Sequence, residues 1–305
     1  MSKVWFITGA TSGFGTTVTE AAIARGDVVV ATAVSLIIRP YAPAAASLTA
    51  PQRNPSKPAF KRLAELGATM LQLDITDSDA AIAAVVAEAV RRHGRIDILL
   101  NNAGYALEGA VEEVSREEAQ AQFDTNVFGQ LAVLRAVLPV MRAQRAGVVA
   151  NMGSLVGWRS FPIVGIYGAS KYAVAGFSVT LRDEMAGLGI DVTTIEPGYF
   201  RTNFLEDGHK IIAAKRIADL APYTAPFRQT MHDSNLKQLG DPVKGAKVIV
   251  EALTKSGRCE GRRLPARLLL GSDSVAQVEE TLSELKKDLD EWRDLSVSTD
   301  HDDVN

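Results

Sequence analysis

The sequence predicts an α/β fold with a doubly wound parallel sheet and a mostly helical C-terminal lid. Short, wholly apolar runs alternate with amphipathic helical segments from residue 4 to about residue 195. The first apolar run ends in a glycine-rich turn, and polar or glycine-containing motifs follow several later runs. Apolar strands of this kind are typical of parallel sheets covered by helices on both faces. In such a fold, ligands bind at the carboxyl ends of the strands.

Composition allows one large domain and excludes several classes of function. At 305 residues with 47% hydrophobic residues, the chain can bury a large core, and we assign residues 1–294 to a single domain. The formal net charge is −3, so the sequence shows no excess of basic residues of the kind that binds nucleic acid. One cysteine, Cys259, and four scattered histidines predict no metal site. No apolar run reaches the roughly 20 residues of a membrane span, and the first strand begins too early for a signal peptide, so we expect a cytoplasmic protein.

The first element is a strand at residues 4–7 that runs into a turn holding Gly9, Gly13 and Gly15. Glycines let the backbone turn sharply, and they let a pyrophosphate approach the free N–H groups of the following helix, residues 13–25. We therefore expect a dinucleotide at this turn. The spacing is Gly-x-x-x-Gly-x-Gly rather than the commoner Gly-x-Gly-x-x-Gly, so an ordinary glycine-rich turn is the alternative for this motif alone.

The second strand, residues 28–33, leads into an anomalous insertion at residues 34–52 that has no helical or strand period. Long structureless segments are uncommon inside compact domains. Removing the insertion would join Ala33 to Arg53, which puts an arginine where the 2′-phosphate of NADP would lie. Valine codons begin with GT and one glutamine codon ends in AG, so a segment that begins with Val34 and ends with Gln52 has the ends expected of an intron in a eukaryotic gene. We therefore interpret the insertion as a retained intron, with a genuine surface loop as the alternative.

The alternation resumes after the insertion. Predicted helices cover residues 57–66, 78–93, 116–141 and 167–185, and predicted strands cover residues 70–74, 96–100, 147–152 and 190–195. Residues 199–240 lack a strand signal and are interpreted as the lid. A helix from Asp241 to about residue 255, a strand at residues 266–270 and a helix at residues 274–292 follow, before a disordered acidic tail at residues 295–305.

Three side chains are predicted to meet at the carboxyl edge of this sheet. Tyr167 and Lys171 lie four residues apart on a predicted helix and therefore share one face. Alone, such a pair is most simply an aromatic residue and a surface lysine on an amphipathic helix. Ser154, however, ends the preceding strand thirteen residues before Tyr167. The convergence of all three residues at one edge is far less common by chance.

These residues, together with the glycine turn, Asn101-Asn102-Ala103-Gly104 and Pro197-Gly198, closely resemble the short-chain dehydrogenase/reductase family over about residues 4–202. The resemblance implies a Rossmann-type sheet and hydride transfer between a nicotinamide and an alcohol or carbonyl. It also implies a catalytic group made of Asn126, Ser154, Tyr167 and Lys171. The implied cofactor-binding residues are Gly9, Ser12, Gly13, Phe14, Gly15, Arg53, Asp74, Asn101, Asn102, Ala103, Gly104, Tyr167, Lys171, Pro197, Gly198, Phe200 and Thr202.

By the same resemblance, Asp74 would meet the adenine, Asn102 the adjacent ribose region, and Phe200 and Thr202 the nicotinamide carboxamide. On chemical grounds, we expect Tyr167 to act as the general acid or base. Its reference pKa of about 10 is too high for a base near neutrality, and two positive charges, from Lys171 and the oxidised nicotinamide, would favour the phenolate. We expect Ser154 to bind the substrate oxygen and Lys171 also to hold the ribose hydroxyls.

Asn126 is expected to keep a water molecule in the proton path, although a polar residue that kinks or caps a helix is equally consistent with its position. The expected cofactor is NADP rather than NAD, because Ala33 stands where an acidic residue would select NAD. The expected protein is a homodimer or homotetramer.

Apolar and aromatic residues beyond Thr202 predict an apolar ketone or alcohol substrate, although the same side chains could serve only to pack the lid. These residues are Phe204, Leu205, Tyr223, Phe227 and Met231. Gly271-Ser272-Asp273 and the strand before it resemble the retinol and hydroxysteroid dehydrogenase-like branch. Two other functions stay open: a catalytically silent nucleotide-sensing protein, against which the intact Ser, Tyr and Lys argue, and an epimerase or dehydratase, whose usual glycine spacing differs.

Overall fold

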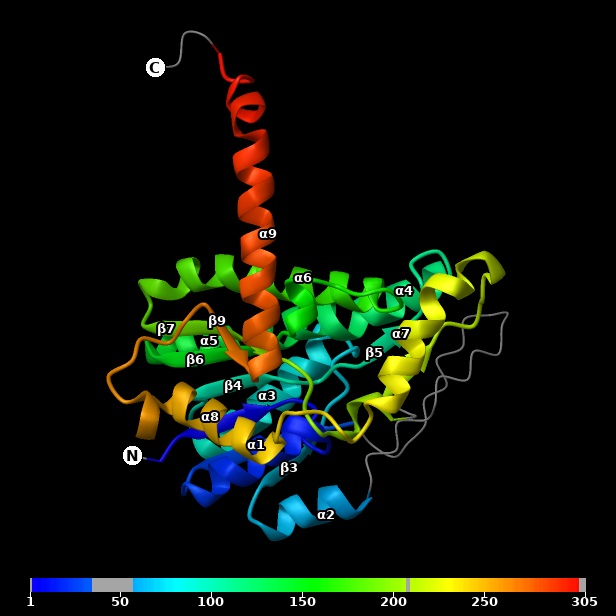
Figure 1. Ribbon diagram of the computed structural model, residues 1–305. Coiled ribbons are helices and arrows are strands. Elements are labelled where there is room, and N and C mark those ends of the chain that lie inside the picture. Colours follow the sequence, from blue (N-terminus) through cyan, green and yellow to red (C-terminus); the bar gives the residue numbers. More distant parts are fainter. Residues whose placement is uncertain (1, 35–56, 207–208, 302–305) are drawn as a thin grey trace.

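The computed structural model describes residues 2–34, 57–206 and 209–301 and confirms the doubly wound α/β fold (Figure 1). Seven parallel strands form the central sheet in the order β3-β2-β1-β4-β6-β7-β9. The strands are β1 (Val4–Ile7), β2 (Val28–Ala33), β3 (Thr69–Gln72), β4 (Ile98–Asn101), β6 (Gly147–Met152), β7 (Ile190–Pro197) and β9 (Arg267–Leu270). Because β1 pairs with both β2 and β4, the order reverses there and opens a crevice at the end of β1.

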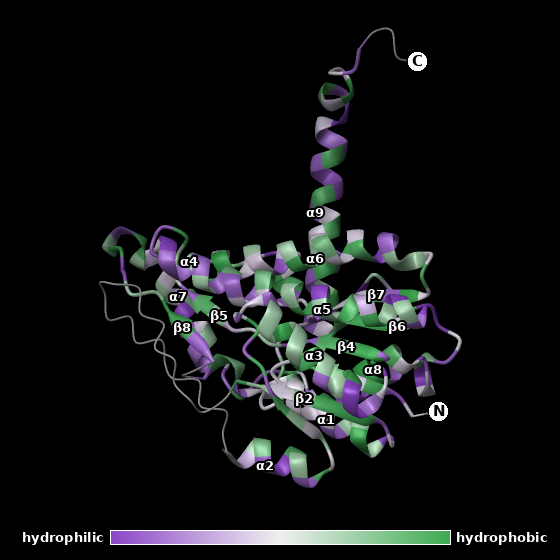
Figure 2. Cartoon of the chain, turned by 180° about the vertical axis from the view of Figure 1, so that it is seen from behind, coloured by the Kyte–Doolittle hydropathy of each residue, from purple (hydrophilic) through white to green (hydrophobic). Residues whose placement is uncertain are grey.

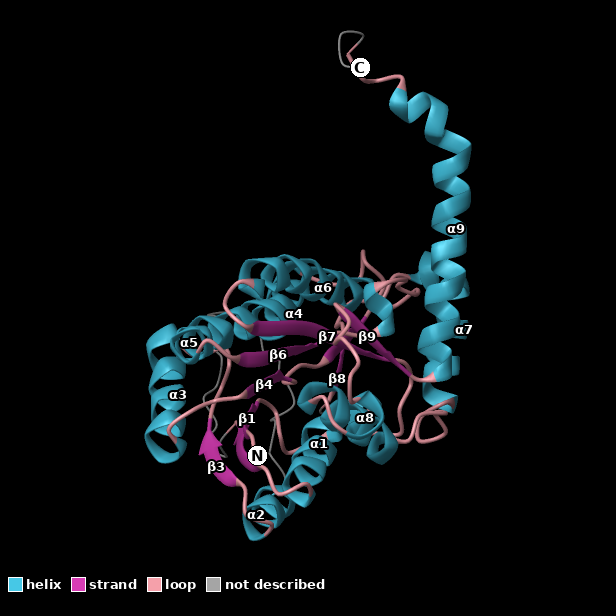
Figure 3. Cartoon of the chain, turned by 90° about the vertical axis from the view of Figure 1, so that its left-hand side faces the viewer, coloured by secondary structure: helices cyan, strands magenta, loops and turns pink. Residues whose placement is uncertain are grey.

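Helices cover both faces of the sheet (Figure 3). They are α1 (Gly13–Ala24), α2 (Lys57–Glu65), α3 (Asp79–His93), α4 (Arg116–Phe123), α5 (Gly129–Gln144), α6 (Gly165–Ala186), α7 (Ala221–Asp233), α8 (Pro242–Thr254) and α9 (Ser272–Val297). Alternation along β1 divides the core, since neighbouring strand side chains point to opposite faces. Trp5 packs in the cluster that includes residues of α1 and α8, whereas Phe6 packs in the cluster that includes residues of α3, α5 and α6.

The predicted long helix at residues 116–141 is interrupted in the structure. A π-helical turn, η1 (Asp124–Phe128), separates α4 from α5. Asn126 lies in this turn and is completely buried, and its side chain bonds to the backbone of Tyr105 in a neighbouring loop. Such turns are frequent at functional sites because they redirect side chains that a regular helix would place elsewhere.

The expectation that residues 199–240 contain no strand is wrong. A three-residue strand, β8 (Lys210–Ile212), pairs in parallel with β5 (Ala106–Glu108) to form a separate small sheet. The lid is therefore tied to the segment that follows β4. Ion pairs strengthen the connection, because Lys210 bonds Glu108 at 2.7 Å and Arg228 on α7 bonds both Glu108 and Glu113.

The C-terminal helix is longer than predicted. α9 continues through Val297, so residues 295–297, assigned from the sequence to a disordered tail, are helical. Most of α9 extends away from the body of the protein (Figures 1 and 3). The anomalous insertion lies outside the described residues except for Val34. No helix in the described ranges combines the length and apolarity needed to cross a membrane.

Candidate active site

The glycine turn between β1 and α1 allows two chain segments to meet at backbone distance. Gly9 has φ of 62°, and a Cβ built on it would lie 2.9 Å from the Cα of Ala103. A Cβ on Gly15 would lie 2.2 Å from the carbonyl oxygen of Gly9. Side chains at these positions would force the turn apart. The turn therefore requires glycine for both its conformation and its packing.

The start of α1 suits an anion. Ser12 takes the extended conformation of an N-cap, but within the described residues its hydroxyl makes no capping hydrogen bond, and the first turn carries no acidic residue. The first N–H groups of a helix have no partners within the helix and lie at the positive end of its dipole. The turn of Ser12, Gly13 and Phe14 thus offers N–H groups to a phosphate.

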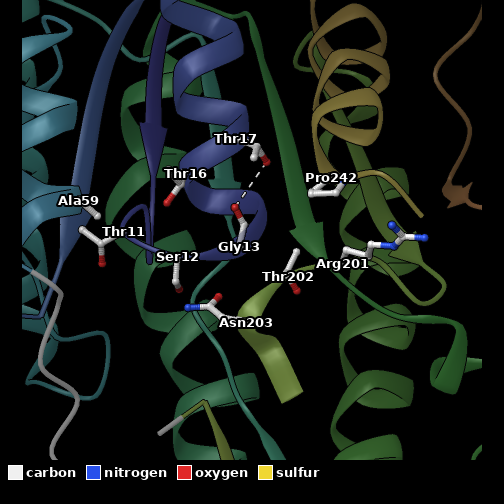
Figure 4. Close-up of a pocket in the computed structure, with 10 residues that line it drawn as sticks. All are labelled: Thr11, Ser12, Gly13, Thr16, Thr17, Ala59, Arg201, Thr202, Asn203 and Pro242. Carbon is white, nitrogen blue, oxygen red and sulfur yellow. Dashed lines mark hydrogen bonds between the residues drawn. The ribbon is translucent and has the colours of Figure 1, made fainter. Parts of the chain in front are cut away.

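A hollow of about 320 Å³ opens at this helix start (Figure 4). Its lining comes from the glycine turn, α1, α2, the segment after β7 and the start of α8. The lining residues are Thr11, Ser12, Gly13, Thr16, Thr17, Ala59, Arg201, Thr202, Asn203 and Pro242. Of the residues implied as cofactor ligands, Ser12, Gly13 and Thr202 line it.

The Asn101-Asn102-Ala103-Gly104 motif holds the glycine turn from the side. The Thr8 hydroxyl oxygen accepts hydrogen bonds from the backbone N–H groups of Asn102 and Ala103. The Asn102 side-chain amide donates to the carbonyl oxygens of Thr8 and Gly9, both at 3.0 Å. Asn102 therefore fixes the turn as well as lying beside it.

Two of the implied cofactor residues have their side chains engaged elsewhere. The Asn101 amide is fully buried and donates to Asn151 at 2.9 Å, so its side chain faces the protein core. The carboxylate of Asp74 accepts two hydrogen bonds from Thr76, through its backbone N–H and its hydroxyl. Arg53, the predicted phosphate-binding residue, lies outside the described residues.

The segment after β7 packs against the glycine turn. Phe200 contacts Phe14 edge to face, with ring centroids 4.9 Å apart, and both rings are buried. Gly198, which follows Pro197, has no room for a side chain, because a Cβ there would lie 2.1 Å from the Asp273 carboxylate. That carboxylate accepts a hydrogen bond from the Tyr199 backbone N–H. The start of α9 thus positions the chain that leads to Thr202.

Ser154, Tyr167 and Lys171 come together as the sequence predicts. β6 ends two residues before Ser154, and α6 carries Tyr167 and Lys171 on one face, where both are buried. The Ser154 hydroxyl hydrogen-bonds the Tyr167 hydroxyl. The Lys171 ammonium lies 5.7 Å from the centroid of the Tyr167 ring and donates to the Met152 carbonyl oxygen at 2.7 Å.

The protein's own groups shift the Tyr167 pKa in the direction opposite to that expected from Lys171. Burial raises the pKa of the phenol; the Ser154 hydrogen bond lowers it, and the nearby Tyr199 hydroxyl raises it further. Desolvation disfavours the phenolate, and here it outweighs the opposing hydrogen bond. Burial also lowers the pKa of Lys171 to about 8. Tyr167 is therefore protonated at neutral pH.

Asn126 is brought to this group, but its amide is already engaged. Its Nδ2 donates to the Tyr105 carbonyl oxygen at 3.0 Å and to the Ser170 hydroxyl at 3.2 Å. The Ser170 hydroxyl donates in turn to the carbonyl oxygen of Tyr167. Asn126 and Ser170 thus connect η1 to the catalytic helix. Ser170, which precedes Lys171 directly, was not identified from the sequence.

Two further features near the site were not visible in the sequence. Tyr199 raises the pKa of Tyr167 electrostatically, although 32 residues separate the two along the chain. Beside Gly153, the residue before Ser154, the buried Glu196 carboxylate accepts hydrogen bonds from the indole N–H of Trp158 and from Arg267. No local pattern marks these contacts, because each joins different strands or loops at the edge of the sheet.

The lid contributes apolar side chains to one side of Tyr167. The Phe204 ring lies 5.9 Å from the Tyr167 ring, and Met231 packs in the same apolar cluster. Tyr223 and Phe227 are exposed instead. Of the lid residues proposed from the sequence to face an apolar substrate, Phe204 therefore lies next to the reacting group, and Met231 packs against the cluster to which that group belongs.

Comparisons with known proteins agree with this geometry. Residues 3–210 match the short chain dehydrogenase family. Oxidoreductase BOA17 of Botryotinia fuckeliana is 31% identical over 304 residues, which cover 98% of this chain and all of that protein. A 3-ketodihydrosphingosine reductase of Bacteroides thetaiotaomicron is 34% identical over 67% of this chain and 66% of its own length.

A solved structure gives the same result. The crystal structure of a short-chain dehydrogenase from Streptomyces avermitilis is 36% identical, with a TM-score of 0.82 and coverage of 98% of both chains. The family match and the full-length similarity to a named oxidoreductase extend across the glycine turn and the Ser154, Tyr167 and Lys171 group. The chain belongs to the short-chain dehydrogenase/reductase family and is an NAD(P)-dependent oxidoreductase.

Proposed function

We propose that this protein is an NADP-dependent oxidoreductase that transfers a hydride between nicotinamide and an apolar ketone or secondary alcohol, in the cytoplasm. The observation that carries the proposal is the buried group in which Ser154 hydrogen-bonds Tyr167 and the Lys171 ammonium lies 5.7 Å from the centroid of the tyrosine ring. A binding protein without catalytic activity has no need for a phenol and an ammonium group that are both costly to bury.

Each of these side chains has a distinct task. The Ser154 hydroxyl binds the oxygen atom of the substrate. Tyr167 donates a proton to that oxygen during reduction, and its raised pKa keeps the phenol in the proton-donating form at neutral pH. Lys171, held by the Met152 carbonyl, keeps a positive charge next to the phenol and so stabilises the phenolate left behind. Asn126 and Ser170 hold the catalytic helix in place.

The residues at the glycine turn fit a dinucleotide. The backbone N–H groups of Gly13 and Phe14 and the Ser12 hydroxyl would hold its phosphates, and Thr202 would contact its nicotinamide end. A bound nicotinamide dinucleotide supplies or accepts the hydride. The choice of NADP rests on the end of β2, where Ala33 offers no carboxylate to a ribose 2′-hydroxyl, and on the proposed position of Arg53.

An apolar substrate is supported by the side chains around Tyr167. The Phe204 ring lies beside the Tyr167 ring, and Met231 packs against the same apolar cluster. The relative from Bacteroides thetaiotaomicron is named for the reduction of 3-ketodihydrosphingosine, which is a ketone. We therefore expect ketones with extended apolar groups to be better substrates than small polar ones.

The direct test follows absorbance at 340 nm as the purified protein meets NADPH or NADH with a panel of ketones of increasing chain length. Turnover with NADPH that increases with apolar surface is the expected result. Tight dinucleotide binding by calorimetry without turnover on any panel member, or on the matching alcohols with NADP, would instead support the nucleotide-sensing alternative.

A further inference from the structure

A buried ion pair joins β7 to β9 near the segment that carries Ser154. The Arg267 guanidinium on β9 donates to the Glu196 carboxylate on β7 at 2.7 Å. The Glu196 side chain is 1% exposed and that of Arg267 is 21% exposed. The carboxylate also accepts a hydrogen bond from the Thr194 hydroxyl at 2.8 Å. None of these three side chains belongs to the catalytic group, so the ion pair has a role outside the chemical steps.

The ion pair lies on a face of the sheet that is otherwise apolar. Strands in the middle of the sheet, such as β4, are mostly hydrophobic (Figure 2). Alternate residues of a strand point to the same face, so Thr194 and Glu196 share the face on which Val192 packs with residues of α5 and α6. Backbone pairing already joins the two strands, with Thr194 opposite Arg267. The strands therefore do not need the ion pair to stay together, and burying its charges is costly.

Both partners of the ion pair reach the short helix η2 (Leu155–Gly157) or the residue after it. The Arg267 guanidinium donates to the Gly157 carbonyl oxygen at 3.0 Å, and its central carbon lies 3.7 Å from the centroid of the Trp158 ring. The Trp158 indole N–H donates to the Glu196 carboxylate at 2.6 Å. These contacts fix the end of η2 to both β7 and β9.

The helix η2 in turn directs the Ser154 hydroxyl. The hydroxyl oxygen accepts a hydrogen bond from the backbone N–H of Val156 at 3.3 Å, and the same hydroxyl hydrogen-bonds Tyr167. The end of η2 also lies against the catalytic helix, since a Cβ built on Gly157 would be 3.1 Å from the Lys171 carbonyl oxygen. A displacement of η2 would therefore move the Ser154 hydroxyl relative to Tyr167.

We propose that Glu196 and Arg267 are positioning residues, whose ion pair holds η2 so that the Ser154 hydroxyl stays aligned with Tyr167. This inference rests on the proposed function, in which Ser154 binds the substrate oxygen. A guanidinium suits the task because its donors point in fixed directions, so one side chain links the Glu196 carboxylate to the Gly157 carbonyl. A displacement of about 1 Å at a reacting group can lower the rate by about a hundredfold.

The test begins with Glu196→Gln in the full-length protein. This variant preserves the size of the side chain but removes its charge and places an N–H donor among the donors that surround it. We expect kcat to fall by about 10- to 100-fold, while the dinucleotide Kd from calorimetry stays within about twofold of the wild-type value. Trp158→Phe is a milder second variant, because it keeps the ring that Arg267 covers and loses the indole N–H. Circular dichroism checks that both variants are folded.

Glu251→Gln is the matched control. Glu251 lies in the last turn of α8, its side chain is 13% exposed, and its carboxylate pairs with Arg258 at 2.6 Å. The substitution therefore removes the same charge from a similar ion pair without touching η2. It should leave kcat unchanged.

The pH profile of alcohol oxidation supplies a readout that lost stability alone would not move. The Ser154 hydrogen bond lowers the pKa of Tyr167, so poorer alignment should raise that pKa. Since the phenolate is the base in this direction, the rising limb of kcat/KM should move to higher pH in Glu196→Gln and stay in place in Glu251→Gln. A lowered kcat with an unmoved limb in Glu196→Gln overturns the proposal.

A Ser154→Ala background separates positioning from a purely structural role. If Glu196 acts through Ser154, Glu196→Gln should lower kcat by less than about twofold in this background. An equal loss with and without Ser154 overturns this inference alone, as does unchanged kcat in the otherwise wild-type protein. Wild-type kcat in Ser154→Ala itself overturns the proposed role of Ser154 and this inference with it. Trp158→Phe takes the place of Glu196→Gln in the cycle if the latter does not fold.

Discussion

The Nζ atom of Lys171 lies 5.7 Å from the centroid of the Tyr167 ring and is held there by a 2.7 Å hydrogen bond to the Met152 carbonyl oxygen. The two residues are one helical turn apart on α6, so their spacing along the chain sets their proximity. The carbonyl oxygen of Met152, the last residue of β6, fixes the position of the Lys171 ammonium group through this hydrogen bond. The strand β6 and the helix α6 together therefore place the positive charge beside the phenol.

Removal of the phenol hydroxyl should abolish most of the activity. Tyr167→Phe keeps the ring and its contact with Phe204 but loses the transferable proton, so kcat should fall by about 10²–10⁴-fold. Dinucleotide affinity, measured by fluorescence titration, should remain near that of the wild type. Tyr223→Phe, on an exposed residue of the lid, is the matched control. Near-normal turnover by Tyr167→Phe would exclude the proposed mechanism.

Stability should depend on pH through Lys171. Burial lowers its folded-state pKa to about 8 from 10.5. Between these values the unfolded chain binds more protons than the folded chain, so the free energy of unfolding should increase as the pH rises from about 8 towards 10.5. Lys171→Met removes this dependence. Relative to that variant, the wild type should gain about 3 kcal/mol over this range, an order-of-magnitude value.

Urea unfolding at pH 7, 8, 9 and 10 measures this difference. Lys247→Met, on an exposed residue of α8, should follow the wild-type curve. Curves of wild type and Lys171→Met that run parallel across the whole range would mean that Lys171 titrates normally. The same variant should lose both turnover and dinucleotide affinity, because one side chain is proposed to serve both.

Phe204 should matter for apolar substrates only. Phe204→Ala removes one wall next to Tyr167, and the loss of apolar contact should raise KM for long-chain ketones by roughly 10- to 100-fold. The dinucleotide Kd should stay within about twofold of the wild-type value, a precision set by ordinary titrations. Phe227→Ala, on the exposed side of α7, should change neither constant. A larger loss of dinucleotide affinity than of substrate affinity would place Phe204 at the cofactor instead.

The insertion at residues 34–52 can be tested by deletion. If it is a retained intron, the shortened chain should be more stable than the full chain and should prefer NADP to NAD by about 10- to 150-fold, the range for a charge-assisted contact of about 1.5–3 kcal/mol. Arg53→Ala in the shortened chain should remove that preference. Failure of the shortened chain to fold, with the codons present in mature transcripts, would identify the segment as a genuine loop.

The sequence alone determined the elements and most of their order. Strands such as residues 4–7 are apolar throughout and helices such as α6 are periodic, because each element must bury one face or both, and the spacing of apolar residues along the chain records that requirement. The sequence also placed Ser154, Tyr167 and Lys171 at one edge, since parallel strands present their carboxyl ends together.

Tertiary structure alone decided what lies beyond that local pattern. β5 and β8 are three residues each, too short for a periodic signal, and they pair although they lie 104 residues apart at Ala106 and Lys210. The influence of Tyr199 on Tyr167 likewise depends on tertiary structure, because Tyr199 follows β7 whereas Tyr167 lies on α6. The direction of the Tyr167 pKa followed from burial, a property of the whole fold, which outweighed the hydrogen bond from Ser154.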